Sequence, residues 1–183
     1  MSGREFTLYS GSAAGAEACF GENAEKYGLT EVNFTFPGHA DKRTRGLKVL
    51  AADELMKGDV SLSYLSKLMN RTYKDTPLIR NVLRSIWHQI NHGQEIFVVG
   101  WINDDQTVKG GTGWGAEFAK LCNKPLYVFD QDQGRWLSWT DGAFTACETA
   151  PVISHPQFTG TGTRRLDERG RQAINELFER SFG

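Results

Sequence analysis

Residues 108–117 run Val108-Lys109-Gly110-Gly111-Thr112-Gly113-Trp114-Gly115-Ala116-Glu117, with four glycines in six positions. An apolar run rich in β-branched and aromatic residues, 96–102, precedes them and is typical of a strand buried on both faces of a parallel sheet. Residues 116–121 fit a short helix, and 124–129 form a second apolar run. This order of strand, glycine loop, helix and strand predicts an α/β fold, with a Rossmann-like, open, mostly parallel sheet flanked by helices.

The glycine loop is a candidate anion site. A helix begins with free backbone N–H groups and the positive end of its dipole, so a phosphate placed over the loop is favoured. Glycines at 110, 111 and 113 let the backbone approach such a ligand closely. Glu117, one turn into the predicted helix, puts an acid beside this site. The alternative is a tight glycine turn with Glu117 facing solvent.

A second loop of small residues, Gly11-Ser12-Ala13-Ala14-Gly15, follows a predicted strand at 6–10. It leads into a helix that Gly28 ends as a left-handed cap. Two helix N-termini would then meet at the carboxyl edge of one parallel sheet, where open α/β sheets bind their ligands. The alternative is that these small residues only allow the helix to pack closely on the strand.

The middle of the chain supplies further elements. Alternating residues at 30–37 predict a strand, and the basic loop 39–45 either reaches a ligand phosphate or is solvated. Residues 48–70 predict one or two short helices broken near Gly58, with a buried stripe of Leu62, Leu65, Leu68 and Met69.

A longer helix begins at Thr76-Pro77 and ends at Gly93. One face carries an apolar stripe, and the opposite face carries Arg80, Arg84 and His88 at steps of four. Such arginines are ordinarily solvated. Here the helix leads into the strand at 96, so it can pass beside the ligand edge of the sheet.

The C-terminal third begins with Asp130 at the end of the 124–129 strand. A ribose-binding acid could stand there, and a turn-capping aspartate is the equal alternative. Asp141-Gly142 between alternating aromatic residues predicts a β-hairpin added near residues 135–147. We further expect a brief strand at 152–153, a small-residue loop at 158–164 and a terminal helix.

Composition narrows the function classes. The 183 residues, 39% of them apolar, predict a single domain, 1–183. A formal net charge of −1 and a pI near 6.4 favour neither nucleic-acid nor membrane binding. Cys19, Cys122 and Cys147 are widely spaced, which suggests reduced thiols. With no apolar leader or long apolar run, we expect a cytoplasmic protein. His39 has no second histidine at ligand spacing, so we assign no metal, and no cofactor is implied.

Two segments together resemble a known family. Gly11 to Gly15, followed by Phe20, Ala24 and Gly28, resembles the opening pattern of the LONELY GUY proteins, often labelled lysine decarboxylases. Residues 110–117 are similar to their Pro-Gly-Gly-x-Gly-Thr-x-x-Glu signature. The wider SLOG superfamily includes Rossmann-like nucleotide binders, YpsA-type proteins and DprA. The resemblance covers about half the chain.

The resemblance implies a nucleotide-phosphate site and, in catalytic members, hydrolysis of the N-glycosidic bond of a nucleoside 5′-monophosphate. Glu117 matches the catalytic glutamate of the signature, and Arg80, with Arg84 as the alternate, matches the helix arginine. The ligand-binding residues carried over or inferred from the two loops are Gly11, Ser12, Ala13, Gly15, Gly110, Gly111, Thr112, Gly113, Trp114, Arg84 and Asp130.

Three departures bear on the reaction. Lys109 replaces the signature proline, Trp114 replaces the signature threonine, and residues 36–39 stand where the family has a second glycine-rich segment. The leading hypothesis is therefore a nucleotide-binding SLOG protein with phosphoribohydrolase-type activity. Its alternative is a non-catalytic sensor or carrier of a nucleotide-derived ligand, and a DprA-like single-strand binder is a third, disfavoured by the charge. A homodimer is expected by analogy.

Overall fold

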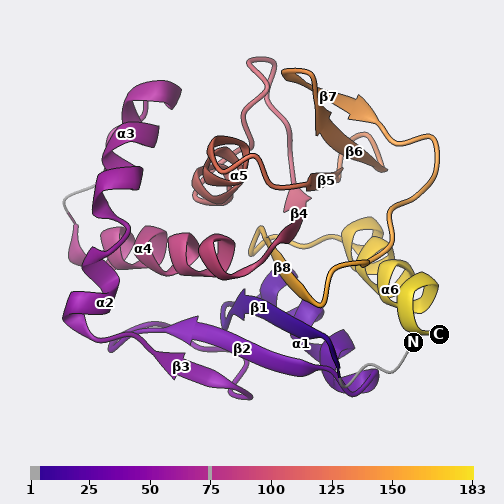
Figure 1. Ribbon diagram of the computed structural model, residues 1–183, viewed down its shortest axis with the longest axis horizontal. Coiled ribbons are helices and arrows are strands. Elements are labelled where there is room, and N and C mark those ends of the chain that lie inside the picture. Colours follow the sequence, from indigo (N-terminus) through magenta and orange to yellow (C-terminus); the bar gives the residue numbers. More distant parts are fainter. Residues whose placement is uncertain (1–4, 74–75) are drawn as a thin grey trace.

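The computed structural model describes residues 5–73 and 76–183, whose strands form one sheet in the order β3-β2-β1-β8-β4-β5-β6-β7 (Figure 1). The strands are β1 (Thr7–Gly11), β2 (Thr30–Thr35), β3 (Leu47–Val49), β4 (Glu95–Gly100), β5 (Leu126–Asp130), β6 (Arg135–Thr140), β7 (Ala143–Ala146) and β8 (Gln157–Gly162). The helices are α1 (Ala16–Lys26), α2 (Ala52–Met56), α3 (Asp59–Met69), α4 (Pro77–His92), α5 (Thr112–Leu121) and α6 (Glu168–Phe182).

The sheet is parallel from β3 through β5, and only the hairpin strands β6 and β7 run antiparallel. The predicted α/β fold, with its open, mostly parallel sheet and its added hairpin near 135–147, is confirmed. Asp141 and Gly142 both adopt positive φ, as the two-residue turn of such a hairpin requires.

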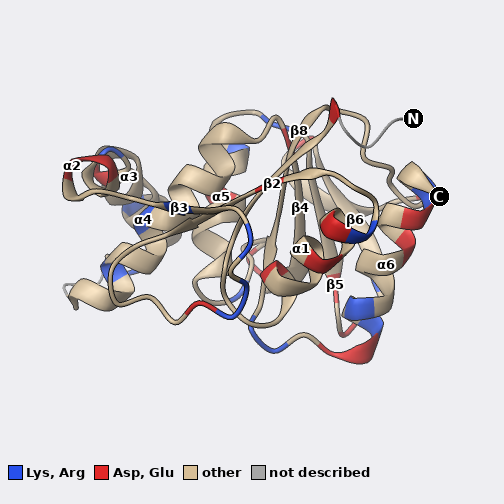
Figure 2. Cartoon of the chain, turned by 90° about the horizontal axis from the view of Figure 1, so that it is seen from below, with Lys and Arg blue, Asp and Glu red and all other residues tan. Residues whose placement is uncertain are grey.

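Two hydrophobic layers sandwich the sheet, and β4 contributes to both. Phe97 and Val99 pack with α1 and α6, whereas Ile96 and Val98 pack with α3, α4 and α5. All four are fully buried, and burial of each such side chain contributes about 1.5–3 kcal/mol. Figure 2 shows the two helical layers on opposite sides of the strands. Because β4 is buried on both faces, its residues form the unbroken apolar run seen in the sequence.

The middle strand, β8, lies where the sequence predicts a small-residue loop, so that prediction is wrong. β8 pairs with β1 on one side and β4 on the other. A Cβ at Gly160 would lie 2.3 Å from the Phe20 ring, so only glycine lets α1 pack this closely on the strand. The expected strand at 152–153 is also wrong, because these residues form no strand.

The region between β2 and α4 differs from expectation at two places. Strand β3 replaces part of a predicted helical region, and the arginines of the preceding loop bind β2: Arg43 and Arg45 both form ion pairs with the buried Glu31. The break between α2 and α3 near Gly58 is confirmed. Leu68, predicted as buried, is 54% exposed; it lies four residues after Tyr64 on the outer face of α3.

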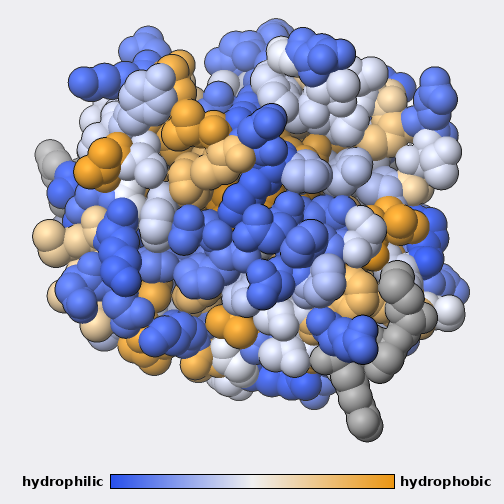
Figure 3. Space-filling model, viewed as in Figure 1, coloured by the Kyte–Doolittle hydropathy of each residue, from blue (hydrophilic) through white to orange (hydrophobic). Residues whose placement is uncertain are grey.

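Helix α4 begins and ends as the sequence predicts, at Pro77 and before Gly93. Helix α1 ends at Lys26 with Tyr27 as its C-cap, followed by Gly28 with φ 72°. Within residues 5–73 and 76–183, no helix combines the length and apolarity needed to cross a bilayer. On the face in Figure 3, hydrophilic residues are interspersed with smaller apolar patches.

Candidate ligand-binding site

A cavity of about 780 Å³ opens at the carboxyl edge of the sheet. The ends of β1 and β8 form its floor at Gly11 and Gly162, and the loops that follow β1, β4 and β8 form its rim. One face of α4 forms a wall. The strand order β1-β8-β4 brings the two predicted glycine loops to this edge, two interstrand spacings apart, or roughly 10 Å.

The glycine loop at residues 110–113 is fixed by a cation behind it. Arg71 donates from Nη1 to the carbonyl of Gly110 at 3.1 Å, and from Nη2 to the carbonyl of Val108 and the hydroxyl of Thr107 at 3.0 Å each. A Cβ at Gly113 would lie 1.9 Å from the Val108 carbonyl oxygen. Glycine at 113 therefore lets the first turn of α5 pack directly onto the loop.

Helix α5 presents an open N-terminus to the cavity. Its N-cap residue is Gly111, which has no side chain to accept from the first-turn amides; the amides of Gly113 and Trp114 donate to the carbonyls of Gly110 and Gly111. Gly110, Gly111 and Thr112 all line the cavity. First-turn N–H groups with no cap are the donors that an anion accepts from, and the helix dipole adds to that attraction.

The N-terminus of α1, by contrast, is occupied by the protein itself. Ala16 donates its amide to the carbonyl of Thr163 at 2.9 Å, and the Glu17 carboxylate accepts from the Ala13 amide at 3.0 Å. Gly15, with φ 91°, packs against the backbone of residues 163–164. This loop therefore binds the chain that follows β8 more than it opens to a ligand.

Glu17 supplies the carboxylate of the cavity. Its residue is only 6% exposed, yet it lines the cavity wall. Besides the Ala13 amide, it accepts from Gln89 Nε2 and Thr161 Oγ1, each at 3.2 Å. A buried carboxylate is retained only where hydrogen bonds compensate for lost hydration, and these three contacts supply them.

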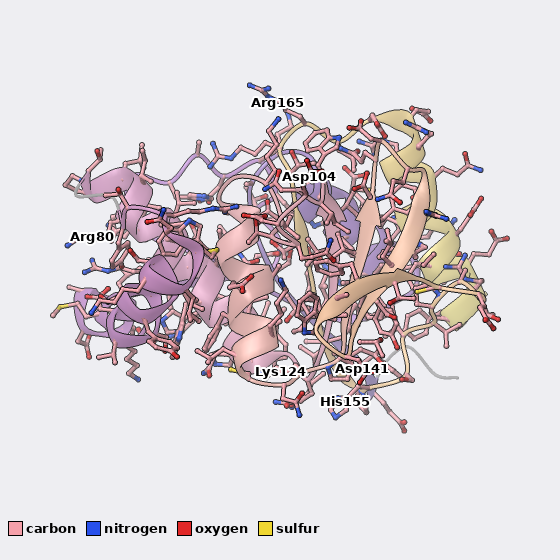
Figure 4. The ribbon with its side chains drawn as sticks, turned by 90° about the horizontal axis from the view of Figure 1, so that it is seen from above. Arg80, Asp104, Lys124, Asp141, His155 and Arg165 are labelled. Atoms are coloured by element: carbon pink, nitrogen blue, oxygen red, sulfur yellow. The ribbon has the colours of Figure 1, made fainter. Side chains whose placement is uncertain are left out.

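Three cations stand on the rim: Lys109, Arg164 and Arg165 are exposed and line the cavity. None of them forms a salt bridge with another residue in the described part of the chain. The ammonium of Lys109 lies 5.6 Å from the centre of the Trp101 ring. Figure 4 shows Arg165 at the edge of the sheet opposite to Lys124 and His155. The rim thus carries positive charge near the open end of α5.

The wall from α4 is apolar. Its lining residues Leu78, Ile79, Val82, Leu83 and Ile86 belong to the stripe predicted as buried. Leu78 and Ile79 are 53% and 44% exposed, because they border the cavity and not the core. Phe34 of β2 lines the same space. An apolar wall beside a cationic rim suits a ligand with a flat ring and an anionic group.

His39 also lines the cavity, held from behind by Asp41. His39 Nδ1 lies 2.7 Å from Asp41 Oδ1, and Ser12 and Thr35 donate their hydroxyls to the same carboxylate oxygen. Burial alone would raise the pKa of Asp41, but the hydrogen bonds from Ser12, Thr35 and His39 outweigh it and lower that pKa. Because Ser12 and Asp41 both meet Nδ1, this cluster does not have the geometry of a serine nucleophile relay.

The predicted ligand residues divide into two groups. One group lines the cavity and consists of Gly11, Ala13, Gly110, Gly111 and Thr112. The others lie behind it: Ser12 binds Asp41, Gly15 packs on the 163–164 backbone, and Gly113 packs on Val108. Trp114 is 5% exposed, and its ring is tilted by 42° against that of Tyr73, at 5.8 Å between centroids.

Glu117 lies outside the residues that line the cavity. Its carboxylate pairs with Lys120 at 3.0 Å, and the Lys120 ammonium lies 3.9 Å from the centre of the Trp139 ring in the hairpin. Helix α5 begins at Thr112. Glu117 therefore falls in the second turn and faces the hairpin.

The two predicted arginines of α4 also face away from the cavity. Arg84 makes two hydrogen bonds of 2.7 Å to the carboxylate of Asp59 in α3. The guanidinium carbon of Arg80 lies 4.7 Å from the centre of the Tyr73 ring, and Figure 4 shows Arg80 at the α3–α4 side of the molecule. The apolar face of α4 meets the cavity, so the arginine face meets α3.

Asp130 caps a turn. Its carboxylate accepts from the backbone amides of Ile102, Asp132 and Gln133 at 2.9–3.0 Å, and the residue is 3% exposed. These contacts correspond to the turn-capping alternative. They also fix the chain segment after β4, where residues 101–109 form a loop closed by an antiparallel bridge between Ile102 and Val108.

Sequence reasoning missed the polar groups that do reach the cavity. Glu17 and Gln89 belong to no motif on their helices, and Lys109 stands in the sequence only as a departure from a signature. Arg164 and Arg165 follow a segment mistaken for a loop. Among the described residues there is no group of three or more histidine, cysteine, aspartate or glutamate residues that is suited to a metal ion.

Comparison with known proteins identifies the fold. The sequence matches no protein-family model and no curated protein. Among solved structures, one from Syntrophus aciditrophicus SB, described as "Putative molybdenum carrier protein", aligns with a TM-score of 0.54, over 97% of this chain and 94% of that chain, at 14% sequence identity. At such low identity the similarity establishes the shared α/β fold and nothing about the ligand.

Proposed function

We propose that this protein is a non-catalytic carrier or sensor of SLOG type, which binds a phosphorylated, ring-bearing small molecule such as a nucleotide. One observation carries the proposal: the start of α5 and three rim cations, which form no salt bridge within the described residues, face the same cavity as the apolar wall of α4. The phosphate would accept from the amides of residues 110–112, and Lys109 and Arg164 would neutralise its charge.

The apolar wall would hold the ring of the ligand. Leu83 and Ile86 of α4 line the cavity with Phe34 of β2, and Trp101 lies on the rim beside Lys109. Ring stacking and contact with aliphatic side chains suit a heterocycle, which has apolar faces and a polar edge. These contacts would bind and orient a ligand, and none of them requires a chemically reactive side chain.

Binding without chemistry is favoured over hydrolysis for two reasons. The expected acid, Glu117, is engaged by Lys120; Arg84 is engaged by Asp59 of α3, and Arg80 lies over the Tyr73 ring. Glu17, the carboxylate that lines the cavity, already accepts three hydrogen bonds. The description of the structural neighbour as a molybdenum carrier also favours carriage, and molybdate, an oxyanion, belongs among the ligands to test.

The test combines binding and product analysis on the whole protein. We would titrate AMP, GMP, their nucleosides, inorganic phosphate and molybdate by calorimetry and thermal unfolding, and analyse the mixtures for free base by chromatography. Ligand at 100 times its Kd stabilises by about 2.7 kcal/mol, or roughly 5–10 °C in Tm for a chain of this size. Monophosphates should do so more than nucleosides, with the base still attached.

A matched pair of variants locates the site. Replacing Arg164 and Arg165 by alanine should weaken monophosphate binding by about tenfold or more, since each removes a charge-assisted contact. Arg135→Ala is the control, because this exposed guanidinium bonds to the nearby Gln133 side chain and does not line the cavity. Release of free base would establish a hydrolase instead, and unchanged Tm with every ligand would refute the proposed binding site.

A further inference from the structure

The cavity is lined by two side chains, Gln89 and Glu17, with acceptor positions that the described residues leave unused. Gln89 is 1% exposed and lines the cavity, and its Oε1 has no hydrogen-bond partner among the described residues. Its amide orientation is fixed, because the end that faces the Glu17 carboxylate has to be the NH₂ group, which donates. A buried carbonyl without a donor costs about 1–3 kcal/mol, so a ligand that supplies one is favoured.

Glu17 contributes the second acceptor. A carboxylate offers about four acceptor positions, and Glu17 uses three, two at Oε1 and one at Oε2. The remaining position is at Oε2. Since Gln89 and Glu17 are joined by a 3.2 Å hydrogen bond, the two open acceptors belong to adjacent side chains.

Gly11 makes room for this pair at the end of β1. A Cβ there would lie 2.3 Å from Glu17 Oε2 and 2.6 Å from Gln89 Nε2. The floor is thus shaped by the absence of a side chain, and the two polar groups lie over the strand end. The open start of α5 follows β4, roughly 10 Å away across β8. A ring on the floor and a phosphate at α5 are separated as they are within one nucleotide.

We propose that Glu17 and Gln89 recognise a ring edge that presents two neighbouring N–H donors, the 2-amino-4-oxo-pyrimidine edge shared by guanine and pterins. The ring N–H and one amino hydrogen donate to Glu17 Oε2 and Gln89 Oε1, respectively. Adenine presents one donor and one acceptor at the corresponding edge, and hypoxanthine lacks the amino group. This inference rests on the proposed function, because the phosphate must sit at α5 for the ring to reach the floor.

The first experiment needs no mutation. Calorimetry would compare GMP, IMP and AMP, which share ribose and phosphate, and would compare guanosine with neopterin to separate a purine from a pterin source. GMP should bind at least about tenfold more tightly than IMP or AMP, since a polar site rejects ligands that leave its buried groups unpaired. Tighter binding of either guanosine or neopterin supports the edge and identifies the ring.

The second experiment uses variants. Glu17→Gln should bring the GMP to IMP affinity ratio towards one while binding of inorganic phosphate persists. Glu22→Gln is the matched control, the same change on the same helix at a residue whose side chain is 58% exposed. Gln89→Leu removes the other acceptor and decides the matter should Glu17→Gln fail to fold.

These experiments distinguish failure of the proposed ring recognition from failure of the proposed phosphate site. Equal affinity of the wild-type protein for GMP, IMP and AMP would overturn the recognition edge and leave the proposed phosphate site standing. Absence of binding by every monophosphate would overturn both. A retained preference for GMP in both Glu17→Gln and Gln89→Leu would show that other residues select the ring.

Discussion

The side-chain amide of Gln89 on α4 donates to the carboxylate of Glu17 on α1 across 3.2 Å, although 72 residues separate the two. This contact joins helices from the two opposite layers of the sheet at its carboxyl edge. It passes over the end of β1, where Gly11 has no side chain. The polar floor of the cavity therefore depends on one glycine, one acid and one amide from different elements.

Gly11→Ala should disturb this floor without disrupting the fold. Gly11 does not have a positive φ, so alanine fits the backbone there, but its Cβ would displace the Glu17 and Gln89 side chains. We expect ligand affinity to fall by about tenfold, the equivalent of one lost hydrogen bond, with a small change in Tm.

The control has to be another small residue with room for a larger side chain. Gly142→Ala is a poor control because φ is positive at residue 142. Gly93→Ala is also unsuitable, since Thr159 occupies the space that its Cβ would need. Ala14→Ser on the same loop is the better comparison, because residue 14 is exposed.

Arg71→Met should loosen the glycine loop. Arg71 makes three hydrogen bonds to residues 107, 108 and 110 from behind the loop, and it does not line the main cavity. Charge-assisted bonds of this kind contribute about 1.5–3 kcal/mol each when buried and less here, where water competes. Urea unfolding should register a loss of roughly 1–2 kcal/mol. Phosphate affinity should fall as well, and unaltered affinity would show that the loop keeps its shape without Arg71.

Much of this fold is visible in the sequence because its signals are local. Hydrophobic spacing identifies α4 and α6, Thr76-Pro77 and Gly28 mark helix ends, and Asp141-Gly142 marks the hairpin. Strand β8 escaped prediction because its composition, with Gly160 and two threonines, is that of a loop. Only the packing of Phe20 against Gly160 explains the glycine, and that contact spans 140 residues of chain.

The candidate site was predictable in its backbone but not in its side chains. Glycine loops at strand ends are recognisable from sequence, and both reach the cavity edge. Glu117 lies one turn into α5 as expected, but its direction depends on its partners, because Lys120 binds it beside the hairpin. Likewise, the sequence shows that α4 has two faces but not which face meets the ligand. The arginine face of α4 turns towards α3 because Asp59 on α3 binds Arg84.

Arg84→Met should lower stability and leave ligand affinity unchanged. The Arg84–Asp59 contact is bidentate, and it lowers the pKa of Asp59 mainly through the hydrogen bond from Arg84. Because the pair is partly exposed, its contribution is about 0.5–1 kcal/mol. A double-mutant cycle with Asp59→Asn would isolate it. Weaker binding of GMP or AMP by Arg84→Met would instead restore the arginine to the ligand site.

The pH dependence of stability tests the burial of His88. Burial lowers the pKa of this imidazole, opposed by its hydrogen bond to the Glu54 carbonyl and reinforced by His92 nearby. The unfolded chain therefore takes up the proton first. The contribution of His88 to the free energy of unfolding is complete above about pH 6.5, the ordinary histidine pKa, and is lost as the pH falls below that value.

The variant His88→Gln keeps an N–H donor but cannot titrate. Between about pH 5 and 7, its free energy of unfolding should depend less steeply on pH than that of the wild-type protein, by less than 1.4 kcal/mol per pH unit. His155→Gln, at an exposed histidine, should retain the wild-type slope. Equal slopes in all three proteins would mean that His88 is as hydrated in the folded chain as in the unfolded one.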